Sequence, residues 1–344
     1  MNNNNKLTTK SLAKLLGVSH TTVSNAWNNP EKLSVALRDK ILRYAQEIGF
    51  QGPDKLARAL RTGKSDAIGV IFNDAMSYAF VDPHDSSLMC GIATACEASH
   101  TNLVLIPLRN RTTHTLHPVT TLVDGYILNA THNSDAVIQQ TLARKLPVVT
   151  LDFSLPQYSS VSIDNARAMQ EICEYLLAKG HRHFGIIAFP SGTGVSGLRD
   201  LSAPVEGDNA VMLTRVNACG QAFLAHGIPP AQCWLYETRH DETSGAFAAS
   251  CLLQAHPEIT ALICLSDRFA AGAIQHCTQH HIAVPGQVAI TGFDNSGVTP
   301  QGIGLTTVAQ DPHKKGQIAV ELLMKQGPVT HYELEYAFIR RESA

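Results

Sequence analysis

The 344-residue sequence lacks any apolar run long enough to cross a membrane. Its longest runs, Ile68–Phe72 and Phe184–Phe189, fall far short of the ~18 residues that a membrane span needs. The first thirty residues also lack the apolar core of a signal peptide, because they are Asn-rich and then amphipathic. We therefore expect a cytoplasmic protein with no membrane partner.

No two of the eight cysteines have the C-x-x-C spacing of a metal or redox motif. Thiols stay reduced in the cytoplasm, and cysteines in apolar stretches, such as Cys173 and Cys264, usually serve as small buried hydrophobic residues. The best metal candidate is the group formed by His276, Cys277, His280 and His281, in which two histidines have the i, i+4 spacing. An exposed polar helix end explains this group more simply, so we predict neither a metal nor a cofactor.

The sequence has little net charge, −2 in total, but this charge is unevenly distributed. Residues 1–65 contain eleven Lys and Arg against four acids, a net of +7, which leaves −9 on the other 279 residues. At about 150 residues per domain, the length predicts two or more structural units. The hydrophobic content of 44% excludes wholesale disorder. We expect the basic N-terminal part to bind a polyanion and the acidic remainder to bind something else.

Residues 8–27 have the pattern of a helix-turn-helix motif. Gly17 would end a first helix capped by Thr8 or Thr9, and Ser19 would cap the second helix. A third amphipathic helix would run from a Ser34 cap to Gly49. The apolar positions that would face a common core are Leu12, Leu15, Leu16, Val18, Val23, Ala26, Leu37, Ile41, Tyr44, Ala45 and Ile48.

The second helix carries side chains suited to reading DNA. His20, Thr21 and Asn25 offer donors and acceptors that can meet base edges in the major groove. We expect Thr8, Ser19 and Asn28 to contact phosphates, which position a protein on DNA without reading the sequence. The motif alone leaves open a second interpretation, a small three-helix domain with solvated polar faces.

A short basic stretch follows these helices. Gly52-Pro53-Asp54 ends in a helix-start signal, and Lys55–Arg61 is rich in Ala, Leu and basic residues. Isolated helices below about 12–15 residues are marginal in water. We therefore expect this stretch to fold only when something binds it.

From Ala67 onward, short apolar runs alternate with helical patterns in two series. The first series runs from Ile68–Phe72 to Val148–Asp152, and the second from Ala166–Lys179 to Val288–Phe293. Such alternation predicts parallel sheets with crossover helices. Two series predict two α/β lobes, with a ligand cleft at the carboxyl ends of their strands.

The sequence resembles the LacI/GalR family over nearly its whole length. The motifs that carry the resemblance are the helix-turn-helix, the basic stretch, Val123-Asp124-Gly125, Ser162-Ile163-Asp164-Asn165, Lys179-Gly180-His181-Arg182, Gly292-Phe293-Asp294 and Leu305-Thr306-Thr307-Val308. The resemblance implies an all-α helix-turn-helix head at 1–52, a hinge helix and linker at 53–65, and a periplasmic-binding-protein-like α/β body of two parallel-sheet lobes at 66–344. Lobe 1 would hold about 66–164 and 309–326, and lobe 2 about 165–308 and 327–344, with the last crossing near Gly327.

The resemblance also implies site residues. Leu60, together with Ala57 and Arg58, would enter the minor groove as an apolar wedge, unless it is a linker residue packed on the body. In the cleft, Asp152, Arg215 and Asp294 match the family's effector contacts, and Ser266 stands where the family often has Asn. Carboxylates that accept hydroxyl protons and a guanidinium that donates would suit a sugar or another polyol. The alternative interpretation is that these carboxylates at strand ends cap loops or pair with nearby basic side chains.

Two stretches, 73–85 and 191–209, do not match the family well. The first could line the cleft. The second contains a literal G-x-G-x-x-G at 192–197, but the residues after it do not continue the dinucleotide-binding pattern, so we interpret this match as accidental.

Together these features predict a homodimeric transcriptional repressor that binds double-stranded operator DNA under the control of a small molecule, a sugar or related polyol. The alternative is a cytoplasmic sugar-binding protein without a DNA function, against which the head and hinge argue. No nucleophile–base pair or metal cluster has a convincing context, so we predict no enzyme. A dimer is favoured over a tetramer because no leucine heptads follow Arg341.

Overall fold

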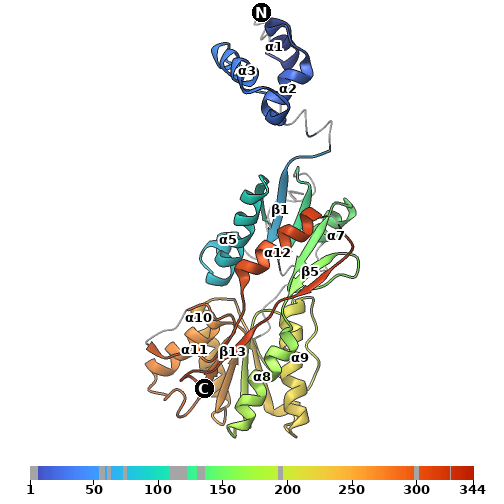
Figure 1. Cartoon of the computed structure of the whole chain (residues 1–344). Helices are drawn as coiled ribbons and strands as arrows, with labels where there is room; N and C mark the ends of the chain where they lie inside the picture. Colours follow the sequence, from blue (N-terminus) through green and yellow to red (C-terminus); the bar gives the residue numbers. More distant parts are fainter. Residues whose placement is uncertain are drawn as a thin grey trace, which may run out of the picture. The chain divides into compact units, whose positions relative to one another are not determined.

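The computed structural model describes residues 7–53, 59, 63–72, 76–107, 122–129, 136–192, 197–297, 302–325 and 327–344 (Figure 1). The chain divides into two compact units, Met1–Ser65 and Asp66–Ala344. Among the described residues, no helix is long and apolar enough to span a bilayer.

The first unit contains three helices, α1 (Thr9–Leu16), α2 (His20–Asn28) and α3 (Val35–Glu47), with a 3-10 turn η1 (Pro30–Lys32) before α3. Their boundaries follow from local chemistry. The hydroxyls of Thr8, Ser19 and Ser34 each accept a hydrogen bond from the backbone N–H three residues later. Gly17 ends α1 with φ of 66°, a left-handed conformation that glycine adopts without strain. The predicted caps are confirmed.

One small core holds the three helices together, formed by Leu12, Ala13, Val23, Ala26, Ile41, Ala45 and Phe50. The prediction for Leu15 was wrong, because this side chain is 57% exposed. The buried side of α1 runs through Leu12, Ala13 and the half-buried Leu16, and Leu15 lies outside it.

The second unit contains two main sheets. The first has the order β12-β5-β4-β3-β1-β2, and all its strands are parallel: β1 (Ala67–Phe72), β2 (Asn102–Pro107), β3 (Gly125–Asn129), β4 (Val148–Leu151), β5 (Ser159–Ser162) and β12 (His331–Glu333). The second has the order β10-β9-β6-β8-β7: β6 (Phe184–Ala188), β7 (Gly197–Asp200), β8 (Cys233–Glu237), β9 (Ala261–Cys264) and β10 (Ala289–Thr291). Only β7, at an edge, is antiparallel to its neighbour. The predicted pair of parallel α/β sheets is confirmed.

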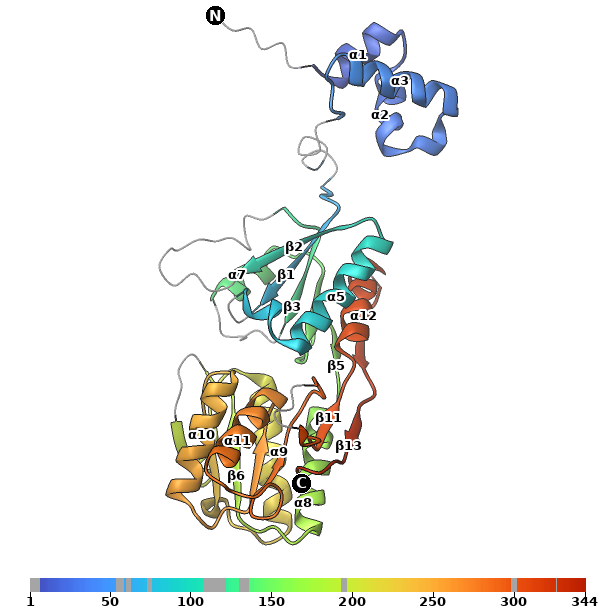
Figure 2. The same ribbon diagram turned by 90° about the vertical axis from the view of Figure 1, so that its left-hand side faces the viewer.

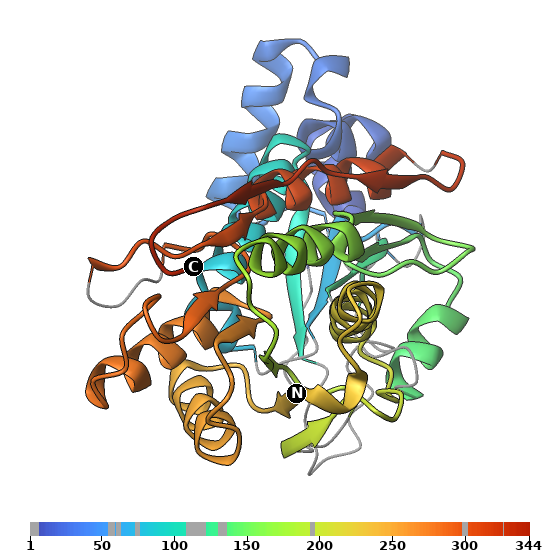
Figure 3. The same cartoon turned by 90° about the horizontal axis from the view of Figure 1, so that it is seen from below.

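Helices cover both faces of each sheet. The first sheet and its helices α5 (Pro83–Ala98), α7 (Ala136–Ala143) and α12 (Pro312–Lys325) are here called lobe 1. Lobe 2 is the second sheet with α8 (Asn165–Ala178), α9 (Ala210–Ala225), α10 (Glu242–Ala255) and α11 (Asp267–Gln279). Neighbouring residues of β6 point to opposite faces, because Ile186 packs with α8 and α9 whereas Ile187 packs with α10 and α11. Figure 3 shows α8 (green) beside α9 (yellow), which contact each other.

Helices α5 and α12 pack against each other (Figure 2). Glycine makes this close approach possible. A Cβ on Gly91 would overlap the carbonyl oxygen of His313, and a Cβ on Gly316 would lie 2.5 Å from the carbonyl oxygen of Leu88. The two backbones therefore touch directly, which fixes α12 beside α5 over strands β3, β4 and β5.

The chain crosses between the lobes three times. The first crossing is capped by Asp164, whose carboxylate accepts from the N–H of Arg167 at the start of α8. The others involve β11 (Thr307–Ala309) and β13 (Ala337–Ile339), which pair antiparallel with each other. The structure moves the last crossing away from Gly327, because β12 pairs with β5 and keeps the chain in the first sheet as far as Glu333.

The two unmatched stretches are partly described. Residues 76–85 form the 3-10 turn η2 (Tyr78–Phe80) and the start of α5. In the 191–209 stretch, Gly197 opens strand β7 rather than the helix that a dinucleotide-binding loop requires. Residues 193–196 lie outside the described part of the chain.

Candidate DNA-binding and effector-binding sites

The candidate base-reading residues lie on α2. His20 and Thr21 are exposed in its first turn, and His20 Nε2 is 2.7 Å from the hydroxyl of Thr9. Asn25 is half-buried, and its side-chain oxygen accepts from Asn29 at 3.3 Å. The helix therefore presents hydroxyl, imidazole and amide groups, all of which can bond with base edges. Their contacts with bases remain a prediction.

The candidate phosphate contacts are engaged within the head. Thr8 and Ser19 cap helices, so each stands beside an N-terminus that favours an anion. The amide nitrogen of Asn28 donates instead to Ser24, at 3.0 Å to its carbonyl and 3.1 Å to its hydroxyl. Asn28 must give up these bonds to reach a phosphate.

The hinge residues Ala57, Arg58 and Leu60 lie outside the described residues. Their predicted role in the minor groove stays a prediction.

Asp152 follows β4 directly and stands in a buried ion pair. Both of its carboxylate oxygens accept from Nζ of Lys315, at 2.6 and 2.9 Å. The Lys315 side chain is fully buried and that of Asp152 is 10% exposed. Burial by itself would raise the pKa of Asp152, but the ammonium of Lys315 outweighs it and holds this pKa below its ordinary value. Asp152 is therefore a carboxylate whose charge is already neutralised.

Asp294 joins the same network from lobe 2. Its Oδ1 accepts from the amide of Gln310 at 2.7 Å, and the amide oxygen of Gln310 accepts from Lys315 at 2.8 Å. Burial raises the pKa of Asp294, while the charges of His84 and Arg215 oppose that rise. A continuous chain of hydrogen bonds thus connects Asp152 to Asp294 through Lys315 and Gln310.

Arg215 is buried in α9, about one turn after the helix begins. Its Nε donates to Asn165 Oδ1 at 2.9 Å, and Nη1 donates to the carbonyl of Leu265 at 2.7 Å. The guanidinium lies 3.5 Å from the ring centre of Phe293, a buried residue just before Asp294. Burial lowers the pKa of Arg215, and the carboxylates of Asp294 and Asp152 oppose this.

Ser266 is buried and serves as the N-cap of α11, where its hydroxyl accepts from the N–H of Phe269 at 3.3 Å. Next to it, Asp267 accepts from the hydroxyl of Thr307 and the N–H of Ser296, both at 2.6 Å. Burial, together with the charge of Asp294, raises the pKa of Asp267 to about 7. Asp267 therefore ties α11 to the segments after β10.

A second polar cluster, which the sequence did not reveal, connects the lobes. The Tyr78 hydroxyl donates to Asp82 at 3.0 Å and lies 2.8 Å from His240 Nδ1 in lobe 2. Arg268 of α11 binds both carboxylate oxygens of Glu242, at 2.7 and 2.6 Å, and places its guanidinium 5.0 Å from the Tyr78 ring centre. We call Tyr78, Asp82, His240, Glu242 and Arg268 the interlobe cluster.

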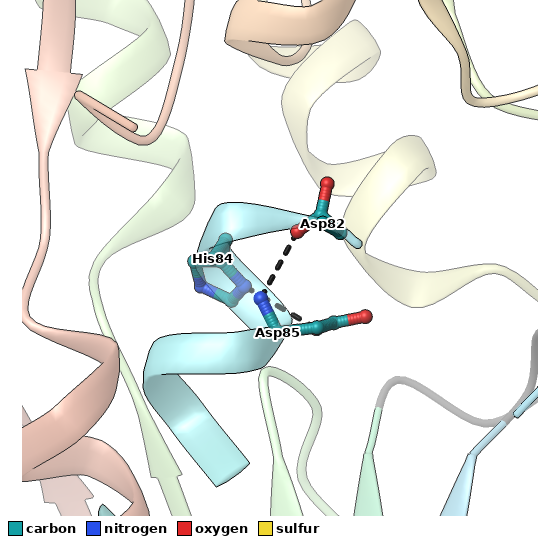
Figure 4. A group of neighbouring side chains, drawn as sticks. All are labelled: Asp82, His84 and Asp85. Atoms are coloured by element: carbon teal, nitrogen blue, oxygen red, sulfur yellow. Dashed lines mark hydrogen bonds and ion pairs between the residues drawn. The ribbon is translucent and has the colours of Figure 1, made fainter. Parts of the chain in front are cut away.

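Asp82, His84 and Asp85 on the first turn of α5 form the one group of potential metal ligands among the described residues (Figure 4). Asp82 already accepts from the N–H of Asp85 and from Tyr78, and Arg268 lies 3.9 Å away. Asp85 accepts weakly from His84 at 3.4 Å. Three of the four carboxylate oxygens of Asp82 and Asp85 therefore already have partners.

The histidines at the end of α11, the metal candidate of the sequence, do not all lie on an exposed helix end as expected. His276 is buried, not exposed, because its ring packs 4.2 Å from that of His280, measured between centres. Burial lowers the pKa of His276.

Three curated relatives match almost the whole chain. An HTH-type transcriptional regulator of Mycobacterium tuberculosis is 37% identical over 93% of this chain and 91% of its own. IpsA of Corynebacterium glutamicum is 32% identical over 92% and 90%, and the repressor CytR of Escherichia coli is 31% identical over 93% and 89%. The chain belongs to the LacI/GalR family of transcriptional regulators. The chain is therefore a DNA-binding transcriptional regulator, as predicted.

Further comparisons agree with the LacI/GalR assignment. The model of the periplasmic binding protein-like domain matches residues 173–344. A LacI-family regulator of Corynebacterium glutamicum has a TM-score of 0.73 with 28% identity, over 99% of this chain and 100% of its own. The lac repressor dimer bound to operator and an anti-inducer has a TM-score of 0.76 with 21% identity, over 98% of both chains. At 21% identity, the similarity to the lac repressor shows a shared fold and nothing more.

The sequence found some site residues and missed others. Asp152, Arg215 and Asp294 are brought together as predicted by the family motifs, whereas Lys315 and Gln310, which connect two of them, were missed. The available signal was the spacing of Lys315, which stands one turn before the apolar Ala319 and therefore on the buried side of α12. A buried lysine needs a partner, which the sequence alone did not show.

Proposed function

We propose that this chain is a cytoplasmic, homodimeric repressor whose affinity for operator DNA changes when a sugar or related polyol binds between its two lobes. Residues 1–52 form the DNA-binding head, residues 53–65 the hinge and residues 66–344 the effector-binding body. In this assignment the chain acts by binding and carries out no reaction.

The observation that carries the effector assignment is the network from Asp152 to Asp294. It brings carboxylate and amide groups from both lobes together where strands β4 and β10 end, which is where ligands sit in α/β folds. Arg215 is near enough for its charge to act on the same two carboxylates. A polyol hydroxyl can both donate and accept, so it suits such a mixed set.

The names of similar proteins support this choice. CytR is a repressor, and structural neighbours at 22–23% identity are described as a cellobiose complex and as a regulator with bound ribose. A pseudo-palindromic operator has two half-sites, so two heads, and therefore a dimer, are needed to bind it. A protein that regulates chromosomal genes works where the chromosome is, which in this assignment is the cytoplasm.

A selection experiment tests the DNA part. Full-length protein is incubated with a random double-stranded library, and the retained DNA is sequenced. We expect a pseudo-palindromic site to be enriched. Asn25→Ala should relax the preference at one position per half-site at a cost of about 1–3 kcal/mol. The control Gln46→Ala, at an exposed position on α3, should leave the motif unchanged.

The operator site enriched in this way is then used to test control by the effector. Gel-shift titrations with and without ribose, glucose or cellobiose should show a changed operator affinity for one of them. If the library yields no enriched site, the chain is a sugar sensor without an operator, and the repressor assignment is wrong.

A further inference from the structure

Unpartnered polar atoms mark the region beside the effector site. Among the described residues, the buried side-chain atoms without a hydrogen-bond partner include Nε2 of His84, Nε2 of His240 and Nη1 of Arg268. A buried polar atom left without a partner costs about 1–3 kcal/mol, so such atoms are rare unless something else binds them. All three belong to the contact between α5 of lobe 1 and the α10–α11 side of lobe 2.

The protonation of His240 can be deduced from its partner. The Tyr78 hydroxyl uses its one proton on Asp82, so its oxygen must accept from His240, and Nδ1 of His240 carries a hydrogen. Burial lowers the pKa of His240 to about 4, so the ring is neutral near neutral pH. Nε2 is therefore a pure acceptor, and it needs a donor from outside the described residues.

The cations of the site are already balanced by carboxylates, because Arg268 pairs with Glu242 and its Nη1, which keeps an unpartnered N–H, lies 3.9 Å from Asp82. Lys315 spends its three N–H groups on Asp152 and Gln310. Arg215 donates to Asn165 and Leu265. The carboxylates of Asp82, Asp85, Asp152 and Asp294 act on the same region. A phosphate has acceptor oxygens and negative charge, so it can neither satisfy His240 nor approach these carboxylates without a penalty.

We propose that His240 is a specificity-determining residue of the effector site: its Nε2 accepts a hydrogen bond from a hydroxyl of an uncharged polyol, and the site rejects phosphorylated sugars. Tyr78 is the positioning residue, because its hydroxyl fixes the tautomer and orientation of His240. This inference rests on the proposed function, since it takes the region between the lobes to be the effector site. Closure of the lobes would then depend on the ligand, which supplies the donor that the protein lacks.

Matched pairs of sugars test the charge preference. Full-length protein is heated with ribose or ribose 5-phosphate, with glucose or glucose 6-phosphate, and with cellobiose, and its melting temperature is followed. We expect an uncharged sugar to raise the melting temperature and its phosphate to have no effect. The proposal is overturned if a phosphorylated sugar stabilises the protein as well as its uncharged partner, or if no uncharged sugar stabilises it.

Variants of His240 test the acceptor. In His240→Asn the amide lies near the position of Nδ1 and can keep the hydrogen bond to Tyr78, but the acceptor at Nε2 is lost. In His240→Gln the longer side chain places an acceptor near the position of Nε2. For the stabilising sugar, His240→Asn should raise the dissociation constant about 10-fold or more, and His240→Gln should stay within about threefold of wild type. His281→Asn is the matched control, because His281 is exposed with φ of 60°, which Asn tolerates.

The outcomes separate the possible explanations. If His240→Asn binds the sugar as tightly as wild type, water alone satisfies Nε2 and the proposal is wrong. An unchanged melting temperature of the unliganded variant shows that a lost affinity does not come from a lost fold. If wild type binds the sugar but no operator, the repressor function fails while the assignment of His240 stands.

Discussion

Replacing Lys315 by Met should destabilise the second unit severely. The Lys315 side chain is fully buried and its partner Asp152 is 10% exposed, so the substitution leaves a largely buried carboxylate without its cation. Breaking a buried pair by removing one partner costs about 3–5 kcal/mol. Met has nearly the same length as Lys, so little of this cost comes from a cavity.

The loss of stability in Lys315→Met should depend on pH. In the wild-type protein the pKa of Asp152 is lowered, so the pair stabilises the fold above the ordinary pKa of aspartate and its contribution is lost as pH falls through the lowered value. In Lys315→Met burial is opposed only by the charges of His84 and Arg215, so the pKa of Asp152 should be raised relative to wild type. The deficit should therefore be largest at neutral pH and shrink as pH falls through that raised pKa.

Urea unfolding of the full chain, followed by circular dichroism, measures both effects. Lys314→Met is the matched control, because the neighbouring lysine is exposed on the same helix. Asp152→Asn added to Lys315→Met should restore part of the stability, since Asn tolerates the φ of 64° at this position. The reasoning is refuted if Lys315→Met lies within about 0.5 kcal/mol of the control, or if the double variant is no more stable than the single one.

Three further predictions concern the head, the hinge and the effector site. Ser19→Ala removes the α2 cap and should cost the head about 1 kcal/mol, measured by Trp27 fluorescence in a Trp234→Phe background; an unchanged melting curve would contradict it. Leu60→Ala should weaken operator binding and leave sugar binding unchanged, and equal operator affinity in a titration would remove the wedge role. Asp294→Asn should keep operator binding but abolish its response to a sugar that acts on wild type, whereas a retained response would exclude Asp294 from the site.

Local signals made the head predictable. Caps depend on one side chain and a backbone N–H three residues away, so Thr8, Ser19 and Ser34 could be assigned from the sequence alone. The prediction for Leu15 failed because Leu15 and the adjacent Leu16 are equally apolar, so the sequence does not decide which of them faces the core.

The contacts between residues far apart in the sequence were not predictable in the same way. Lys315 and Asp152 are 163 residues apart, and Tyr78 and His240 are 162 apart, so no local pattern connects them. Strand β12 has three exposed residues, too few for an alternating pattern, and its pairing with β5 was missed for that reason.

The number of chain crossings decides how this protein can be recombined with its relatives. One peptide junction, between Ser65 and Asp66, separates the head from the rest, so a head of different operator preference can be exchanged by a single splice. A single lobe offers no such splice, because its strands come from separate stretches of the chain and three joints would have to match at once. A chimera that imports a new effector response should therefore carry residues 66–344 as one block.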